Sequence, residues 1–249
     1  MEGKRVRRTF GVGDHESPAA AFRARVRSPI LLPLLTGVGG LVLLHSIERL
    51  VVGHAAPHFN LETDRSFGEL YGYVLAAMIV AGLATLARRS PTMRPLWAVA
   101  GLFGFVLADD LLRIHEQVGE AIGSRTGGWW RLPPAELGQL VYFLTVGGVV
   151  AVGAVVVWRV ASRPSRVVVA WLGLGVAALG GLAAGLDIVH EIVSDRDGNE
   201  IVWVAIEDGG EMVVLALVAS YLFARLQEPE IDLRIPAMRE ALEKVPAQR

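Results

Sequence analysis

The chain has 249 residues, of which 53% are hydrophobic and 20% charged, and its mean hydropathy is +0.45. That composition is too apolar for an ordinary soluble domain of this length and indicates a membrane protein. The net charge of −1, from 24 basic and 25 acidic residues, gives no bias toward nucleic acid, and the absence of cysteine excludes a disulfide framework, a thiolate metal site and a cysteine nucleophile.

A basic leader, residues 1–28, precedes the first long apolar run. It is rich in Arg, contains Gly, Ser and Pro, and has no apolar periodicity, so we predict that it is disordered. The apolar run that follows is longer than the core of a secretory signal. We therefore interpret this run as a retained membrane helix.

Six apolar runs are long enough to cross a hydrocarbon core of about 30 Å, which needs about 20 residues of helix. They are residues 29–52, 70–87, 96–112, 137–158, 167–189 and 203–224. Short polar links with Pro and Arg follow the second and fourth runs, and longer connections follow the first and third. The sequence predicts an all-α polytopic bundle of about six transmembrane helices over residues 29–226, followed by a polar tail, 227–249.

The distribution of Lys and Arg predicts the orientation of this bundle. Eighteen of the 24 basic residues fall in the leader, the tail and the links after the second and fourth runs. Cytoplasmic loops hold the excess of basic residues, so both termini are predicted to be cytoplasmic. We expect a multi-pass protein of the bacterial cytoplasmic membrane, with the lipid bilayer as its surroundings and no nucleic-acid partner.

Ionisable residues gather where four of the runs meet the predicted outer face. The groups are His45, Glu48 and Arg49 in the first run; Asp109, Asp110, Arg113, His115 and Glu116 at the end of the third; Asp187, His190 and Glu191 at the end of the fifth; and Glu207, Asp208 and Glu211 in the sixth. Such residues are costly inside a membrane unless they pair or bind a ligand. Within each group, helical spacing of three, four or seven residues puts most members on one face.

Carboxylates that are packed together repel one another, and a bound cation relieves that repulsion. Aspartate, glutamate and histidine suit Fe, Mn or Zn, so the sequence predicts a divalent metal. The favoured ligands are Asp109, Asp187, His190, Glu207 and Glu211, with His45, Glu48, His115, Glu116 and Glu191 as further candidates and Asp208 as general base. For His115, Glu116, Glu191 and Glu48, helix capping or an interfacial position is an alternative.

The phrases LADDLLRIHE at 107–116 and AAGLDIVHE at 183–191 resemble one found in uncharacterised bacterial multi-pass proteins. In those proteins an acidic residue precedes His-Glu at a span end, and a later span opens with paired acids. This chain departs from that pattern in carrying Arg113 between Asp110 and His115. The resemblance implies no reaction or cofactor.

Three functions follow from this pattern as expectations. The first is a membrane-embedded metalloenzyme, hydrolytic or oxidative, that acts on a lipid-like substrate. The second is a proton- or cation-coupled transporter, although the inner parts of the runs carry no acids. The third is a non-catalytic sensor or assembly protein. The sequence contains no nucleotide-binding loop, no serine-hydrolase elbow and no His-Glu-x-x-His.

Overall fold

The computed structural model describes residues 28–227, except for 54–55, 62, 64, 129–131, 187–188 and 190–199. The predicted leader and tail therefore lie almost wholly outside the described residues, and so do Asp187, His190 and Glu191. The described part of the chain consists of helices and connections, without a strand, which confirms the predicted all-α bundle.

Six long helices correspond to the six predicted runs. In chain order the elements are α2 (Leu31–Val52), α3 (Phe67–Arg89), the 3-10 helix η1 (Pro91–Met93), α4 (Leu96–Leu112), α5 (Ile114–Thr126), α6 (Pro134–Val160), α7 (Arg163–Gly180), the π-helical segment η2 (Gly181–Leu186) and α9 (Glu200–Gln227). Helix α5 was not predicted: its 13 residues fall in a connection, and its glycines favour a loop by propensity alone.

Four of the described helices are long and apolar enough to cross a membrane, namely α2, α3, α6 and residues Ser165–Ala183 of α7 and η2. The chain is therefore a multi-pass membrane protein. Helix α4 has 17 residues, which rise about 25 Å along the axis. Helix α9 is longer, at 28 residues, but carries Glu207, Asp208 and Glu211 in its first half.

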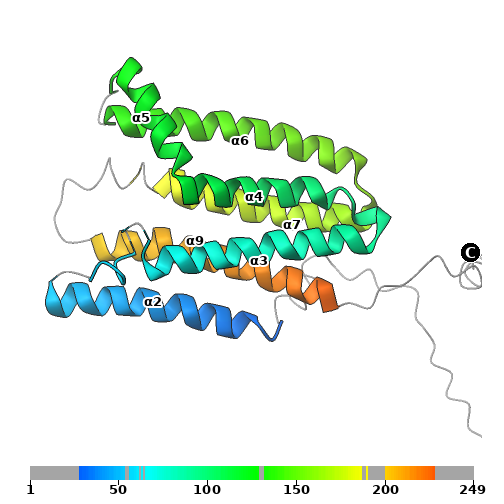
Figure 1. The fold of residues 1–249 in the computed structure, drawn as a ribbon, viewed down its shortest axis with the longest axis horizontal. Helices are drawn as coiled ribbons and strands as arrows, with labels where there is room; N and C mark the ends of the chain where they lie inside the picture. The colour runs from blue at the N-terminus through cyan, green and yellow to red at the C-terminus, as the bar shows by residue number, and fades with distance from the viewer. Residues whose placement is uncertain are drawn as a thin grey trace, which may run out of the picture.

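The helices form an elongated bundle in which α2 and α6 lie at opposite faces (Figure 1). The main core lies between α3, α4, α7 and α9, where Leu83, Phe103, Leu172 and Leu222 are fully buried or nearly so. A smaller cluster around Val38 and Met212 joins α2 to α9. The main core fixes α4 and α9 relative to each other, and both helices carry acidic residues toward the same end of the bundle.

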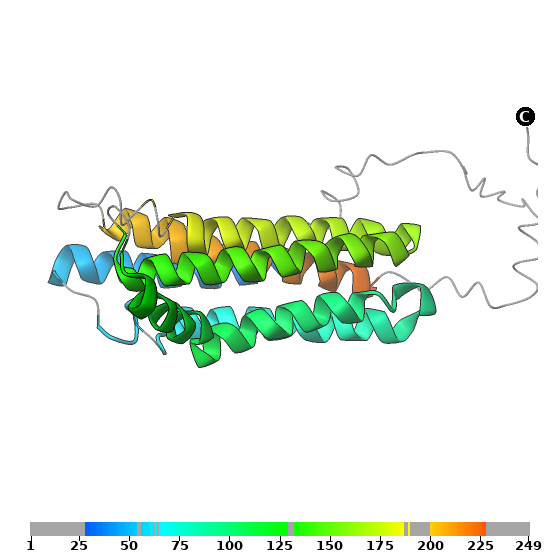
Figure 2. The same ribbon diagram turned by 90° about the horizontal axis from the view of Figure 1, so that it is seen from above.

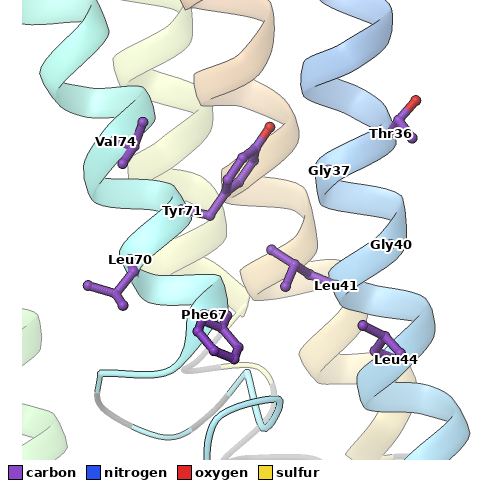
Figure 3. Close-up of a pocket in the computed structure, with 9 residues that line it drawn as sticks. All are labelled: Thr36, Gly37, Gly40, Leu41, Leu44, Phe67, Leu70, Tyr71 and Val74. Carbon is purple, nitrogen blue, oxygen red and sulfur yellow. The ribbon is translucent and has the colours of Figure 1, made fainter.

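We call this end, where α4 gives way to α5, the α5 end. Helix α3 begins here with an N-cap: the Ser66 hydroxyl accepts a hydrogen bond from the Glu69 backbone N–H at 3.2 Å. Nearby, α2 and α3 enclose a shallow apolar groove of about 510 Å³, shown in Figure 3. There Tyr71 reaches toward Gly37, and its hydroxyl donates to the Leu34 carbonyl at 2.8 Å.

Helix α5 owes its position to a glycine contact with α6. A Cβ atom at Gly138 of α6 would overlap the carbonyl oxygen of Gly119 on α5, and one at Gly123 would overlap the carbonyl oxygen of Pro134. Two helix backbones approach this closely only when the residues between them lack side chains. Helix α5 therefore crosses from the end of α4 to the start of α6 (Figure 2).

Candidate metal centre

The junction between α4 and α5 is a sharp turn at Arg113. This residue adopts a left-handed conformation, with φ 52° and ψ 42°, and its backbone N–H bonds to the Asp109 and Asp110 carbonyls. The Gln117 side chain donates to the Leu112 carbonyl at 2.7 Å, which satisfies another end group of α4. The chain thus bends sharply at Arg113 and α5 starts at Ile114.

This turn brings His115 back onto Asp109. The His115 Nδ1 atom lies 3.1 Å from Asp109 Oδ2, while the Tyr142 hydroxyl donates to Asp109 Oδ1 at 2.6 Å. Asp109 is only 6% exposed. The sequence interpretation of one continuous helical face through Asp109, Arg113 and Glu116 was wrong, because the helix breaks at Arg113 and a new helix carries His115.

Asp109, Asp110 and His115 form a triad in which one ligand atom from each residue lies within 4.8 Å of the others. Asp109 is buried, His115 is partly buried and Asp110 is exposed. Two carboxylates and one imidazole make a donor set of the kind that Fe, Mn and Zn accept. A metal held by these three protein ligands would keep a further coordination position open for water or substrate, as metals in catalytic sites do.

Glu116 lies beside the triad but has a different partner. Its carboxylate receives two hydrogen bonds from the Arg113 guanidinium, one of them from Nε at 2.9 Å. One Glu116 oxygen also lies 4.0 Å from His115 Nε2. Predicted as a metal ligand, Glu116 is instead held in an ion pair at the edge of the site.

A cavity of about 1040 Å³ connects the triad to the acids of α9. Its lining includes Glu207, Asp208 and Glu211 together with all three triad residues. Glu211 is within electrostatic range of Asp110 as well as of Asp208 and Glu207. The expectation that acids of separate helices share one layer is therefore confirmed for α4 and α9.

The sequence profile described as Domain of unknown function (DUF8692) matches residues 51–225 of the chain. The chain belongs to the DUF8692 family. The matched stretch runs from the end of α2 almost to the end of α9, so the DUF8692 domain contains the triad and the cavity. Comparisons with curated proteins and with solved structures gave no match. Because the DUF8692 description names no activity, function has to come from the chemistry of the site.

Two predicted ligands lie before the DUF8692 match, on α2, and the structure gives them local contacts. His45 is fully buried, and its Nδ1 atom accepts a hydrogen bond from the Leu61 backbone N–H at 3.3 Å. Glu48 accepts one from the Ala56 backbone N–H. Neither side chain lines the cavity. Both hold the connection between α2 and α3, and the structure does not bring them to the triad.

Sequence reasoning missed Asp110 as a ligand of the triad, and it also missed Glu69, Gln139 and Tyr142, which all line the cavity of this DUF8692 site. Tyr142 matters most because it donates to the buried Asp109. A signal for it was present in the sequence, since a tyrosine within an apolar helix needs a partner for its hydroxyl. Glu69 lies in the first turn of α3, where an acidic residue is common for helix stability alone, so nothing in the sequence indicated a second role.

Replacing Arg113 by glycine should stabilise the DUF8692 domain relative to replacement by alanine. Both variants lose the ion pair with Glu116, but only glycine adopts φ 52° without steric cost. We expect a difference in the free energy of unfolding of about 1–2 kcal/mol, measured by SDS titration in mixed micelles. Equal stability of the two variants would show that the left-handed turn is not strained.

Proposed function

We propose that this protein is a metalloenzyme of the bacterial cytoplasmic membrane that holds a divalent metal in its cavity and acts on a lipid-like substrate. The observation that carries the proposal is the triad of Asp109, Asp110 and His115 at the wall of a cavity within a membrane bundle. In the proposed topology six helices cross the membrane, both termini are cytoplasmic, and the α5 end faces outward.

The triad fits a metal of the Fe, Mn or Zn class by distance and donor type. Ligand atoms bound at about 2.1 Å to one metal can lie up to about 4 Å apart, so atoms within 4.8 Å need only small side-chain rotations. The Tyr142 hydroxyl and the His115 ring already hold the buried Asp109 carboxylate. Such supporting hydrogen bonds orient ligands around metals in proteins.

The charge of the surroundings also favours a cation. Seven carboxylates line the described part of the cavity, against one guanidinium, that of Arg113, which is engaged with Glu116. The carboxylates are Glu69, Asp109, Asp110, Glu116, Glu207, Asp208 and Glu211. Since like charges at this density repel one another, a divalent ion would stabilise the arrangement.

The residues around the triad suit hydrolysis of a substrate held in the cavity. A divalent metal, when bound, supplies Lewis acidity and lowers the pKa of water. Asp208 of α9 faces the same cavity and is the proposed proton acceptor. Tyr142 acts as a positioning residue, because it fixes the Asp109 carboxylate rather than touching the substrate.

Cation transport is the rival function, and the rest of the cavity argues against it. Away from the α5 end its lining consists of apolar residues and glycines, such as Val106, Val150, Val157 and Leu172. An ion path needs polar groups along its length, whereas a hydrocarbon substrate needs an apolar wall of this kind.

The decisive experiment is elemental analysis of the detergent-purified full chain after reconstitution with Fe, Mn and Zn in turn. We expect one equivalent of one metal in the parent protein and less than about a tenth of that in the double variant Asp110→Asn, His115→Gln, because two of three ligands are lost. The matched control is Glu120→Gln, His58→Gln, which removes one carboxylate and one imidazole outside the cavity.

Metal in both the parent and the triad variant would place the ion elsewhere, and a parent that stays metal-free with all three metals would refute the metalloenzyme. Folding of each variant is checked by size-exclusion chromatography. A variant that aggregates is replaced by the single variant His115→Gln, whose side chain is partly exposed.

A further inference from the structure

The cavity continues from its acidic end into a long apolar section between α4, α6 and α7. Leu102 and Phe105 of α4, Val150 and Val157 of α6, and Val176 of α7 belong to this section. Figures 1 and 2 show α6 on one face of the bundle, next to α4 and α7 along this length. The walls are therefore polar at one end and apolar over the remainder, which is the pattern of an amphiphile.

The apolar section opens sideways, toward the bilayer. Three residues that line it keep large exposed fractions, so the protein does not close over them: Phe105 of α4 at 40%, Leu144 of α6 at 68% and Val149 of α6 at 70%. In a membrane, the exterior at this level is lipid hydrocarbon rather than water. A hydrocarbon chain reaches the cavity from the bilayer without crossing an aqueous phase.

Glycines leave room for such a chain. Gly147 and Gly153 of α6 and Gly173 of α7 line the cavity, and a Cβ atom at any of them would meet nothing within 4 Å. At about 1040 Å³ the cavity is at the upper end of the range of about 300–1,000 Å³ typical of ligand sites. The space therefore suits a ligand larger than a metal ion and its water.

The head group that fits the acidic end is set by charge. Carboxylates from α3, α4 and α9 face this end, while the guanidinium of Arg113 is paired with Glu116. An anionic head group would add to this repulsion, whereas an amine reduces it. Glu207 and Glu211 of α9 line this end of the cavity and are not members of the triad, so they mark the place where an ammonium group is best stabilised.

We propose that the cavity binds a membrane lipid with an amine head group, its chain lying between α4, α6 and α7 and its head at Glu207 and Glu211. This names the substrate class of the proposed metalloenzyme and rests on it in that respect, but the binding itself requires no metal.

The test uses photo-crosslinking in nanodiscs with three probes that share a diazirine-labelled hexadecyl chain and differ in their head group: amine, hydroxyl or phosphate. Labelled peptides are mapped by mass spectrometry. We expect labels from the amine probe on α6 and α4 next to the cavity. We expect about tenfold or more labelling by the amine probe over the phosphate probe, since like-charge juxtaposition costs several kcal/mol.

Two variants test the position of the chain against a matched control. Gly147→Trp and Gly153→Trp fill the apolar section, while Gly148→Trp adds the same side chain at a neighbouring position of α6 that does not line the cavity. Labelling should fall at least about tenfold in the first two and stay unchanged in the third. Equal labelling in all three would overturn the chain position.

Comparison of the head groups tests the other half of the proposal. Equal labelling by the amine and phosphate probes, or a preference that survives Glu207→Gln with Glu211→Gln, would overturn the assigned head group. Chelator-treated and metal-loaded protein are both labelled. Cavity labelling in a protein that elemental analysis finds metal-free supports this lipid site while refuting the metalloenzyme. A protein that binds metal but shows no labelling of the cavity supports the metalloenzyme and refutes the lipid site.

Discussion

Replacement of Gly138 by valine should separate α5 from α6 and destabilise the whole α5 end. A Cβ atom there would overlap the carbonyl oxygen of Gly119, which is backbone and cannot turn aside. Overpacking of a tight contact costs about 1–3 kcal/mol and sometimes more, and we expect the upper end of that range or beyond. The measurement is the free energy of unfolding by SDS titration, with metal content determined on the same samples.

Gly148→Val is the matched control for this substitution. It makes the same change on the same helix, at a position where a Cβ atom meets nothing within 4 Å, so any effect of helix propensity is shared. The control should keep its stability to within about 1 kcal/mol. If both variants unfold equally easily, the glycine contact does not hold α5 in place and the position of His115 needs another explanation.

The variant Asp109→Ala should have a lower free energy of unfolding and a lower metal affinity than the parent. The variant Asp109→Asn should have a lower metal affinity alone. Tyr142 is buried, and in the alanine variant its hydroxyl has no acceptor. A buried group without its hydrogen bond costs about 1–3 kcal/mol. Asparagine keeps an acceptor oxygen of the same shape but removes the charge that binds a cation, so its metal affinity should fall about 100-fold or more.

The two measurements are unfolding by SDS titration and titration with the metal that the parent retains. Tyr142→Phe combined with Asp109→Ala separates the causes, since removal of both partners should recover most of the stability lost in Asp109→Ala. Unchanged metal affinity in Asp109→Asn would remove Asp109 from the ligand set and leave it a purely structural role.

The sequence predicted the long helices and the position of the acidic residues toward one end of the bundle. Apolar runs of sufficient length have few alternatives in a membrane, because backbone groups must be satisfied within each segment. The acids of the third and sixth runs, Asp109 and Glu211 among them, were predicted to gather where these runs meet the outer face, and in the structure both line the same cavity. That inference needed only the positions of the acids within the runs and the orientation of the bundle.

The local geometry of the site was beyond such reasoning. A non-glycine residue in the left-handed region, as at Arg113, gives no signal in composition or periodicity. The helix break at Arg113 decides that His115 meets Asp109 and that Glu116 pairs with Arg113. Helix α5 was missed for a related reason: Gly119 and Gly123 lower its helix propensity, and its stability comes from a contact with α6 that is distant in sequence.

Helix α6 packs against the rest of the protein mainly at its two ends, and its middle turns have few protein contacts. At one end Gly138 packs on α5 and Tyr142 bonds to Asp109, and beyond the other end the Ser162 hydroxyl donates to the Thr92 carbonyl at 3.1 Å. No residue within its membrane-crossing window is buried among the described parts of the chain. Lipid must therefore complete the packing of α6, so the width of the cavity depends on the surrounding bilayer. The affinity of the cavity for its lipid should therefore depend on the thickness and fluidity of the bilayer. The same chain should bind that lipid with different affinity in detergent and in nanodiscs, even when every contact within the protein is intact.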